Sequence, residues 1–339
     1  MKDIEIQKNV RLSAHTTLQV GGVADYFVVV KTVEEVRVAL RFAAQTATPP
    51  LILGGGSNLL VSDAGYRGLV IQNRITSKHY EVLDNKVLLT VGAGEMLDEI
   101  VAETTQKGYW GLENLSAIPG TIGATPVQNV GAYGVEVSSL ITSVEAINSV
   151  TKTEKTFTVK ECEFGYRDSY FKTSVGRDWV ITQVTFMLSV KPNPQLAYGS
   201  LQTIAEQKEL TPAVVREAIC EIRAGKFPNW HVIGTAGSFF KNPIIPLAEY
   251  EELKKQYPDI VAYVSDDKNI KVSLGWILDH VCQLRGYCRD GVCLYEQQAL
   301  VLVNLDAADA KTIDDFANHV ADLVFQKTKI KIEREVRSI

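Results

Sequence analysis

The sequence lacks a long apolar run and a leader-like amino terminus. Apolar stretches such as 299–303 have the length of a strand, far below the roughly 20 residues that cross a bilayer. Residues 1–7 alternate charged and apolar side chains, whereas a secretory signal needs an uninterrupted apolar core. These absences predict a cytoplasmic protein with no membrane insertion.

Cysteine and histidine occur without the spacings that build metal sites or disulfide frameworks. The five cysteines contain no CxxC pair, and the five histidines contain no HExxH motif. We therefore expect reduced, buried thiols and no metal held by the protein. The cysteines are Cys162, Cys220, Cys282, Cys288 and Cys293.

Positive charge is not in excess either. A formal net charge of −5 disfavours a nucleic-acid partner, because binding to phosphates requires clustered Lys and Arg. An anionic substrate must therefore meet a locally positive pocket. Nothing in the sequence indicates an obligate protein partner.

What is present is the composition of a globular protein with two or three domains. The 339 residues are 46% hydrophobic and 22% charged, which suffices for large cores. Up to residue 75 the pattern predicts a small α/β unit, in which Thr32 caps a helix and Glu35 closes a capping box. The strands expected there are 26–30, 51–53 and 69–71.

Beyond residue 75 the pattern predicts an α+β segment and then a helix-rich one. A hairpin with its turn at 84–85 precedes a helix that ends at Gly108, and mainly strands are expected over 140–190. After a Pro-rich break, Thr211 caps a helix that ends at Gly225. Further expected helices are 247–257, 274–284 and 313–325, with strands at 237–241, 300–303 and 330–332.

Two glycine-rich stretches follow apolar strands. In 51–60 (LILGGGSNLL), glycines would let backbone N–H groups approach an anion such as a pyrophosphate, and Ser57 and Asn58 add donors. A plain tight turn is the alternative. In 91–97 (VGAGEML), Leu97 occupies the third glycine position of the dinucleotide fingerprint, so this motif indicates a Rossmann site only weakly.

A third stretch, 118–134 (IPGTIGATPVQNVGAYG), holds four glycines and two prolines among apolar residues. Such a run cannot form a regular helix or strand, so its backbone is expected to wrap around something. A purely structural loop is the alternative.

These motifs, together with GLEN at 111–114, FGYRDSYFK at 164–172, GTAGSFFKNP at 234–243 and REVR at 334–337, occur in a recognisable order. The chain resembles the UDP-N-acetylenolpyruvoylglucosamine reductases, also called UDP-N-acetylmuramate dehydrogenases, over essentially all of its length. Tyr198-Gly199-Ser200-Leu201 resembles the first type of this family, in which a loop tyrosine folds over the substrate. One departure is His15-Thr16-Thr17, where the family usually has Asn-Thr-Phe on the flavin side near the amino terminus.

The resemblance implies an α+β fold, with a two-part FAD-binding region of the vanillyl-alcohol-oxidase type plus an α/β substrate-binding domain. The first FAD-binding part would be 1–75. The second would be 76–210, with a carboxyl-terminal strand from 328–339 returning to it, and the substrate-binding domain would be 211–327. It also implies non-covalent FAD, with NADPH as the hydride donor. The flavin-binding residues implied are Gly54, Gly55, Gly56, Ser57, Asn58, Ile118, Gly120, Gly123 and Gly131.

The implied reaction is reduction of UDP-N-acetylglucosamine enolpyruvate, and the implied catalytic residues are Arg167, Ser238 and Glu335. Each of the three has an ordinary alternative: an ion-pair partner, a turn hydroxyl and a solvated charge. A related flavin oxidase with another substrate and a non-catalytic UDP-sugar-binding module remain open as alternative functions. Candidates to bind the substrate or cofactor are Tyr133, Tyr198, Arg223, Lys226, Asn242 and Gln297.

Overall fold

The computed structural model describes residues 4–47, 49–205 and 209–339 and divides the chain into two compact units. Unit 1 comprises Met1–Val10, Ala24–Gly56 and Arg67–Arg223. Unit 2 comprises Arg11–Val23, Ser57–Tyr66 and Ala224–Ile339.

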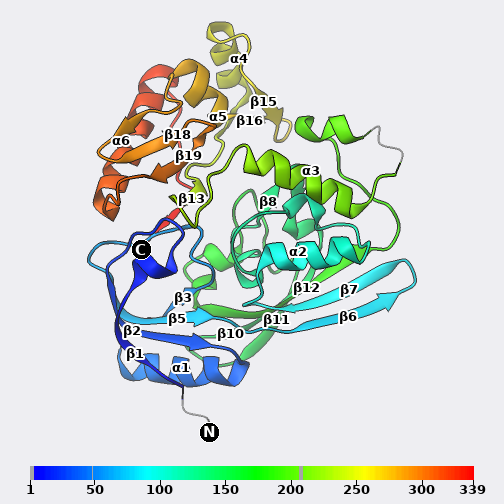
Figure 1. Cartoon of the computed structure of the whole chain (residues 1–339), viewed down its shortest axis with the longest axis vertical. Coiled ribbons are helices and arrows are strands. Elements are labelled where there is room, and N and C mark those ends of the chain that lie inside the picture. Colours follow the sequence, from blue (N-terminus) through cyan, green and yellow to red (C-terminus); the bar gives the residue numbers. More distant parts are fainter. Residues whose placement is uncertain (1–3, 48, 206–208) are drawn as a thin grey trace. The chain divides into compact units, whose positions relative to one another are not determined.

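The first sheet has the strand order β1-β2-β5-β3, and helix α1 covers one of its faces (Figure 1). Val36 and Leu40 of the helix pack with Val28 and Ile71 of the strands in one buried cluster. The Thr32 hydroxyl accepts a hydrogen bond from the Glu35 amide at 3.1 Å, which confirms the predicted cap. The elements are β1 Gln7–Arg11, β2 Val23–Val30, α1 Val33–Gln45, β3 Leu51–Leu53 and β5 Tyr66–Asn73.

The second sheet of unit 1 is antiparallel throughout, in the order β11-β10-β12-β7-β6. Helix α2 packs on it through Leu97 and Val101, which are buried with Val91 and Val184 of the sheet. The predicted hairpin turn at 84–85 and the helix end before Gly108 are confirmed. The elements are β6 Lys78–Leu83, β7 Lys86–Gly92, α2 Leu97–Gln106, β10 Ile141–Asn148, β11 Glu154–Thr158 and β12 Trp179–Ser189.

Helix α3 (Pro212–Ala224) also belongs to unit 1. The predicted cap is present, because the Thr211 hydroxyl accepts a hydrogen bond from the Val214 amide at 3.3 Å. Arg216 holds the helix to α2 through two hydrogen bonds to the Asp98 carboxylate, of 2.5 and 3.0 Å. Burial works to raise the pKa of Asp98, but these bonds and one from the Ala117 amide hold it below its ordinary value.

Shorter elements of unit 1 connect these parts. They are η2 Glu113–Leu115, η3 Ile122–Ala124, β8 Gly131–Ala132, β9 Val135–Glu136, η4 Val137–Ser139, η5 Tyr170–Lys172, η6 Gly176–Asp178 and η7 Gly199–Ile204. Most lie within or beside the glycine-rich loop 118–134, which confirms that this loop is irregular.

Unit 2 contains a four-stranded sheet, β13-β19-β18-β17, and a three-stranded one, β14-β16-β15. Phe316 and Val320 of α6 are buried in one core with Phe239 and Leu302. The elements are η1 Leu12–His15, β4 Leu59–Leu60, β13 Gly234–Ser238, β14 Ile244–Pro246, α4 Leu247–Gln256, β15 Ala262–Val264, β16 Asn269–Val272, α5 Leu274–Trp276, the π-helix η8 Ile277–Val281, β17 Cys288–Arg289, β18 Val292–Tyr295, β19 Gln298–Asn304, α6 Ala310–Thr328 and β20 Arg337–Ser338.

Three sequence predictions in unit 2 differ from the structure. The strand expected at 330–332 is absent, because Lys329 ends α6 in the left-handed conformation (φ 61°). Before β20, the chain then forms an isolated bridge between Arg334 and Phe240. The strand expected at 237–241 runs instead over Gly234–Ser238. The helix expected at 274–284 changes after Trp276 into a π-helix that ends at Val281.

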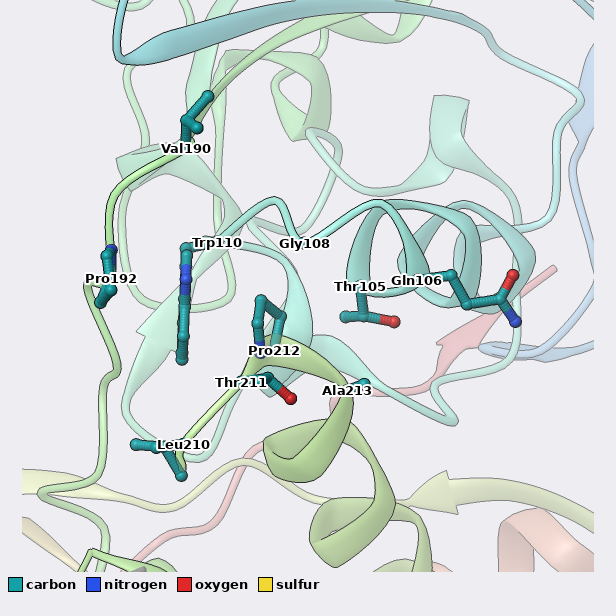
Figure 2. A pocket seen from close by; sticks show the side chains of 10 residues that line it. All are labelled: Thr105, Gln106, Gly108, Trp110, Val190, Pro192, Leu210, Thr211, Pro212 and Ala213. Atoms are coloured by element: carbon teal, nitrogen blue, oxygen red, sulfur yellow. The ribbon is translucent and has the colours of Figure 1, made fainter. Parts of the chain in front are cut away.

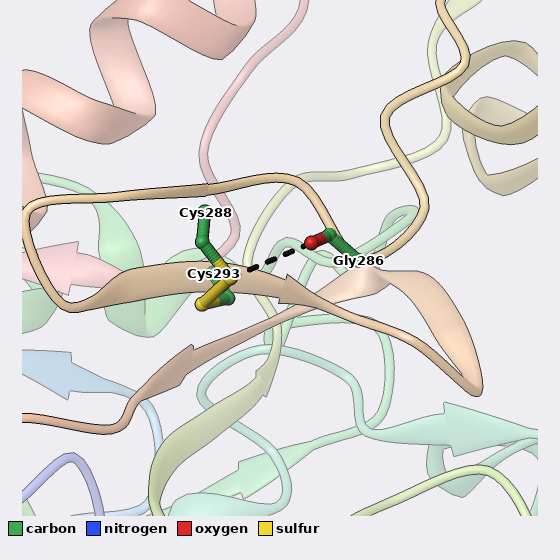
Figure 3. The surroundings of a disulfide bond; sticks show 3 residues. All are labelled: Gly286, Cys288 and Cys293. Carbon is green, nitrogen blue, oxygen red and sulfur yellow. Dashed lines mark hydrogen bonds between the residues drawn. A yellow bond between two sulfur atoms is a disulfide. The ribbon is translucent and has the colours of Figure 1, made fainter.

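The expectation of reduced thiols is wrong for two of the five cysteines. Cys288 and Cys293 form a disulfide across the β17–β18 hairpin, and the Cys288 sulfur lies 3.4 Å from the Gly286 carbonyl oxygen (Figure 3). Asp290 and Gly291 both have positive φ, as a two-residue hairpin turn requires, and this turn sets the two cysteines opposite each other. Cys162, Cys220 and Cys282 are free thiols, and burial raises the pKa of Cys162 to about 12.

The carboxyl-terminal segment pairs with β4 rather than with 76–210. Arg337 and Ser338 of β20 lie in parallel register with Leu59 and Leu60. The three-part division into FAD-binding and substrate-binding domains otherwise stays a prediction. Within the described residues, no helix is both long and apolar enough to span a membrane.

Candidate functional site

The loop 54–56 after β3 packs directly on the start of the 118–134 loop. A Cβ on Gly54 would lie 2.5 Å from the Thr121 hydroxyl oxygen, and one on Gly55 would lie 2.9 Å from the Gly120 Cα. Only glycine permits this approach, because real Cβ contacts are longer. The two predicted flavin-binding loops therefore meet, with backbone packed on backbone at Gly55 and Gly120.

The glycines of 92–94 have a packing reason of their own. A Cβ on Gly94 would lie 2.3 Å from the Arg74 backbone, and one on Gly123 would lie 2.6 Å from the Ala93 Cβ. Strand β7 before them is antiparallel to both of its neighbours, whereas a Rossmann site requires parallel strands. The incomplete fingerprint is therefore a structural turn.

A buried amide orders the far end of the 118–134 loop. Asn129 donates to the Glu136 carboxylate at 2.8 Å and to the Gly165 carbonyl at 3.0 Å, and accepts from the Ser138 amide. The sequence did not indicate this role, because the partners lie up to 36 residues away. Ile118 and Gly131, also predicted to bind flavin, are half-buried in this loop.

Arg167 lies beside the β8–β9 hairpin. Its guanidinium donates to the Gly131 carbonyl at 2.7 Å and lies 5.6 Å from the centre of the Tyr166 ring. Its own carbonyl accepts a hydrogen bond from Lys172 at 2.6 Å, and its φ of 53° is unusual for a residue with a side chain. The surroundings therefore hold the predicted carboxylate-binding arginine in a strained conformation.

Three predicted substrate-binding residues come together in unit 1. The rings of Tyr133 and Tyr198 meet edge to face with their centres 5.3 Å apart. The Arg223 guanidinium donates to the Tyr133 hydroxyl and, through Nε, to the Ala117 carbonyl at 3.2 Å. Burial raises the pKa of Tyr133 and lowers that of Arg223.

A β-bulge positions Ser238 in unit 2. Thr235 pairs with Val303 and Ser238 pairs with Val301, so β13 contains one more residue than β19 between these pairs. Gly237 has a φ of 74°, which permits the bend. Bulges occur frequently beside active sites, where they redirect a side chain.

Glu335 lies close to Ser238 and to Asn58. Its amide donates to the Phe239 carbonyl at 2.9 Å, one residue after Ser238. The Asn58 side chain donates to the Glu335 carbonyl at 3.2 Å, and the Arg337 amide donates to the Asn58 carbonyl at 3.1 Å. Unit 2 thus brings together one predicted flavin-binding residue and two predicted catalytic residues from three distant parts of the sequence.

The remaining candidates are more dispersed. Lys226 is half-buried in the turn after α3, and Gln297 is exposed in the β18–β19 turn. Asn242 accepts a hydrogen bond from the Leu274 amide at 2.9 Å, so it ties the end of the GTAGSFFKNP motif to α5. Ser57 immediately precedes Asn58 and is half-buried.

A depression of about 390 Å³ lies elsewhere in unit 1, between the end of α2 and the start of α3 (Figure 2). Trp110, Pro192, Leu210 and Pro212 are among the residues that line it, and none of the predicted site residues does. Its lining residues include no titratable side chain, so they supply no general acid or base.

Comparison with known proteins gives two family matches and several similar whole chains. The family described as "FAD binding domain" matches residues 24–159, and that described as "UDP-N-acetylenolpyruvoylglucosamine reductase, C-terminal domain" matches residues 228–339. A UDP-N-acetylenolpyruvoylglucosamine reductase of Pseudomonas fluorescens (strain Pf0-1) is 38% identical over 338 residues, covering 98% of both chains. This chain belongs to the UDP-N-acetylenolpyruvoylglucosamine reductase family.

Other members of the family are similar to this chain over nearly its whole length. The UDP-N-acetylenolpyruvoylglucosamine reductase of Escherichia coli (strain K12) is 38% identical, covering 98% of this chain and 96% of its own. The crystal structure of the corresponding Thermus caldophilus reductase superposes with a TM-score of 0.70, at 24% identity, covering 99% of both chains. The predicted α+β fold with an FAD-binding region is therefore confirmed.

Proposed function

We propose that this protein reduces UDP-N-acetylglucosamine enolpyruvate to UDP-N-acetylmuramate, with FAD as cofactor and NADPH as hydride donor, in the synthesis of peptidoglycan precursors. The observation that carries the proposal is similarity to reductases named for this substrate, which are 38% identical over 98% of the chain. A cytoplasmic location follows from the proposal, because nucleotide-sugar and NADPH are cytoplasmic metabolites.

The glycine loops fit an FAD. A Cβ on Gly54 or Gly55 would collide with Thr121 or Gly120, so the two loops pack closely. Glycine-rich backbone of this kind lets N–H groups approach a pyrophosphate without obstruction from a Cβ. Bound there, FAD would take hydride from NADPH and give it to the enolpyruvyl group. The residues proposed to hold it are Gly54, Gly55, Gly56, Ser57, Asn58, Ile118, Gly120, Gly123 and Gly131.

Three side chains are proposed to act on the substrate. Hydride addition at C3 of the enolpyruvyl group moves charge onto C2 and the carboxylate, which requires preorganised positive charge there. Arg167 supplies it, because the planar guanidinium matches a carboxylate. Ser238 gives its hydroxyl proton to C2, and Glu335, whose backbone adjoins that of Phe239, supports the enol through a hydrogen-bond network.

The other polar candidates are proposed to bind the sugar nucleotide. Arg223 and Lys226 offset the charge of the pyrophosphate. Tyr133 and Tyr198 form the aromatic pair beside Arg223, and Asn242 and Gln297 complete the set of hydrogen-bonding groups.

Spectroscopy of the purified protein tests the function. NADPH added without oxygen should bleach the flavin absorbance, and the enolpyruvyl sugar should then restore it. Bleaching without restoration would favour a flavin oxidoreductase with another substrate. A colourless protein that binds the sugar would instead be a non-catalytic binding module.

The cofactor should be held without a covalent bond. None of the five cysteines or five histidines lies in a recognised flavin-linkage motif. Acid precipitation of the purified protein should therefore release all the yellow colour into the supernatant. Colour that stays in the pellet would reject non-covalent binding.

Replacing Tyr198 with alanine should weaken use of the sugar nucleotide much more than oxidation of NADPH. The ring is 39% exposed and contacts Tyr133, so it is accessible to a ligand but is not a core residue. Steady-state kinetics with each substrate varied in turn would measure the two effects. Equal loss in both half-reactions would remove the idea that this tyrosine closes over the substrate.

A further inference from the structure

Asn114, in the GLEN motif, is a fully buried polar residue to which neither the catalytic nor the cofactor-binding roles above assign a function. It lies in η2 and has no exposed surface. Its side-chain nitrogen donates two hydrogen bonds of 2.8 Å, one to the Tyr133 carbonyl and one to the Gln195 carbonyl. The amide is oriented by its chemistry, since a flipped side chain would set its oxygen against two carbonyl oxygens.

The first of these carbonyls belongs to a strained residue. Tyr133 and Gly134 form the two-residue turn between β8 and β9, with φ values of 49° and 85°. Such turns favour Asn or Asp followed by glycine, and a tyrosine in the first position is held at a conformational cost. The bond from Asn114 fixes the peptide that follows Tyr133 and so fixes the direction of its ring.

The second carbonyl lies three residues before Tyr198. On the other side of this tyrosine, Leu201 is buried in a cluster with Trp110, Val215 and Ile219. The segment that carries Tyr198 is therefore anchored at both ends, at Gln195 by Asn114 and at Leu201 by the core. While both anchors hold, the Tyr198 ring can move only through changes in the residues between Gln195 and Leu201.

We propose that Asn114 is a positioning residue that fixes the placement of the Tyr133 and Tyr198 rings relative to each other for recognition of the sugar nucleotide. The proposal rests on the function proposed above. Asn114 touches neither substrate nor cofactor; it acts through the two backbone segments that it joins. Without it, the buried Tyr133 carbonyl and the more exposed Gln195 carbonyl both lose this donor, and the two aromatic rings lose their fixed relation.

The test is Asn114→Leu, which keeps the branched shape and removes both donors. We expect the KM for the enolpyruvyl sugar to rise about tenfold or more, while reduction of the flavin by NADPH keeps its rate. Asn148→Leu is the matched control, because Asn148 is also buried and accepts two backbone hydrogen bonds in the β10–β11 turn, away from any proposed site residue. It should cost thermal stability without changing the KM.

A double-mutant cycle separates positioning from general destabilisation. In the Tyr198→Ala background, Asn114→Leu should raise the KM much less than in the wild type, because the ring it orients is already gone. Fully additive effects, or equal losses in both half-reactions, would overturn the proposal. Absence of sugar-dependent turnover in the wild-type protein would instead reject the proposed function, so the two failures are distinguishable.

Discussion

Replacing Ser238 with alanine should slow reoxidation of the reduced enzyme by the enolpyruvyl sugar by about 10²- to 10⁴-fold, the range typical of a lost general acid. Ser238 lies at the bulge in β13. The carbonyl of the next residue, Phe239, accepts a hydrogen bond from the Glu335 amide. Reduction by NADPH needs no proton at C2 of the sugar, so it should stay near the wild-type rate. Anaerobic stopped-flow measurement of the two half-reactions would separate them.

Ser238→Cys provides the companion variant. A thiol keeps an ionisable proton at this position, so part of the lost rate should return. If the alanine variant were reoxidised as fast as the wild type, Ser238 would be structural, and Glu335 would become the first candidate for the acid.

Replacing Gly54 with alanine should weaken flavin binding by about 5- to 150-fold, which corresponds to the roughly 1–3 kcal/mol typical of overpacking. The added methyl group would lie 2.5 Å from the Thr121 hydroxyl oxygen and would force the two glycine loops apart. Flavin content after dialysis and a titration of the apoprotein with FAD would measure the loss.

The structure supplies a rescue for this variant. The next atoms around a Cβ at Gly54 lie 3.7 Å or more away, so Thr121→Ala removes the 2.5 Å contact. Gly54→Ala with Thr121→Ala should therefore bind flavin better than Gly54→Ala alone. Gly199→Ala is the control, because no atom of the described residues lies within 4 Å of its Cβ position. Failure of the rescue would mean that Gly54 is required for another reason.

Local patterns predicted the regular elements well. The Thr32 cap, the hairpin at 84–85 and the strands expected over 140–190 depend on neighbours in the sequence, and all are present. The strand expected at 330–332 is absent although its residues alternate, because the left-handed Lys329 redirects the chain. The residue types around Lys329 did not indicate a left-handed turn at this position, because lysine has no preference for it.

The disulfide was missed although its signal was in the sequence. Asp290-Gly291 is a strong marker of a two-residue hairpin, and such a turn sets Cys288 opposite Cys293. The spacing of Cys288 and Cys293 is not CxxC, and the pair is recognisable only when the turn between them is taken into account.

Within the candidate site, residue types predicted the glycine loops but not what holds them. Thr121 sets the space around Gly54, and Asn114 donates to a carbonyl that lies 81 residues further along the chain. Neither is recognisable from spacing, because both act through contacts distant in sequence. The proximity of Asn58, Ser238 and Glu335 likewise depends on tertiary structure.

The pairing of β20 with β4 also constrains how the protein is made in the cell. Asn58 and Leu60 are synthesised early, yet their backbone partners are Arg337 and Ile339. At translation rates of about 5–20 residues per second, this stretch waits on the order of ten seconds or more for its partner strand. During that time its unpaired edge is open to other chains, so a nascent-chain chaperone would protect this part of the molecule more than any segment of unit 1.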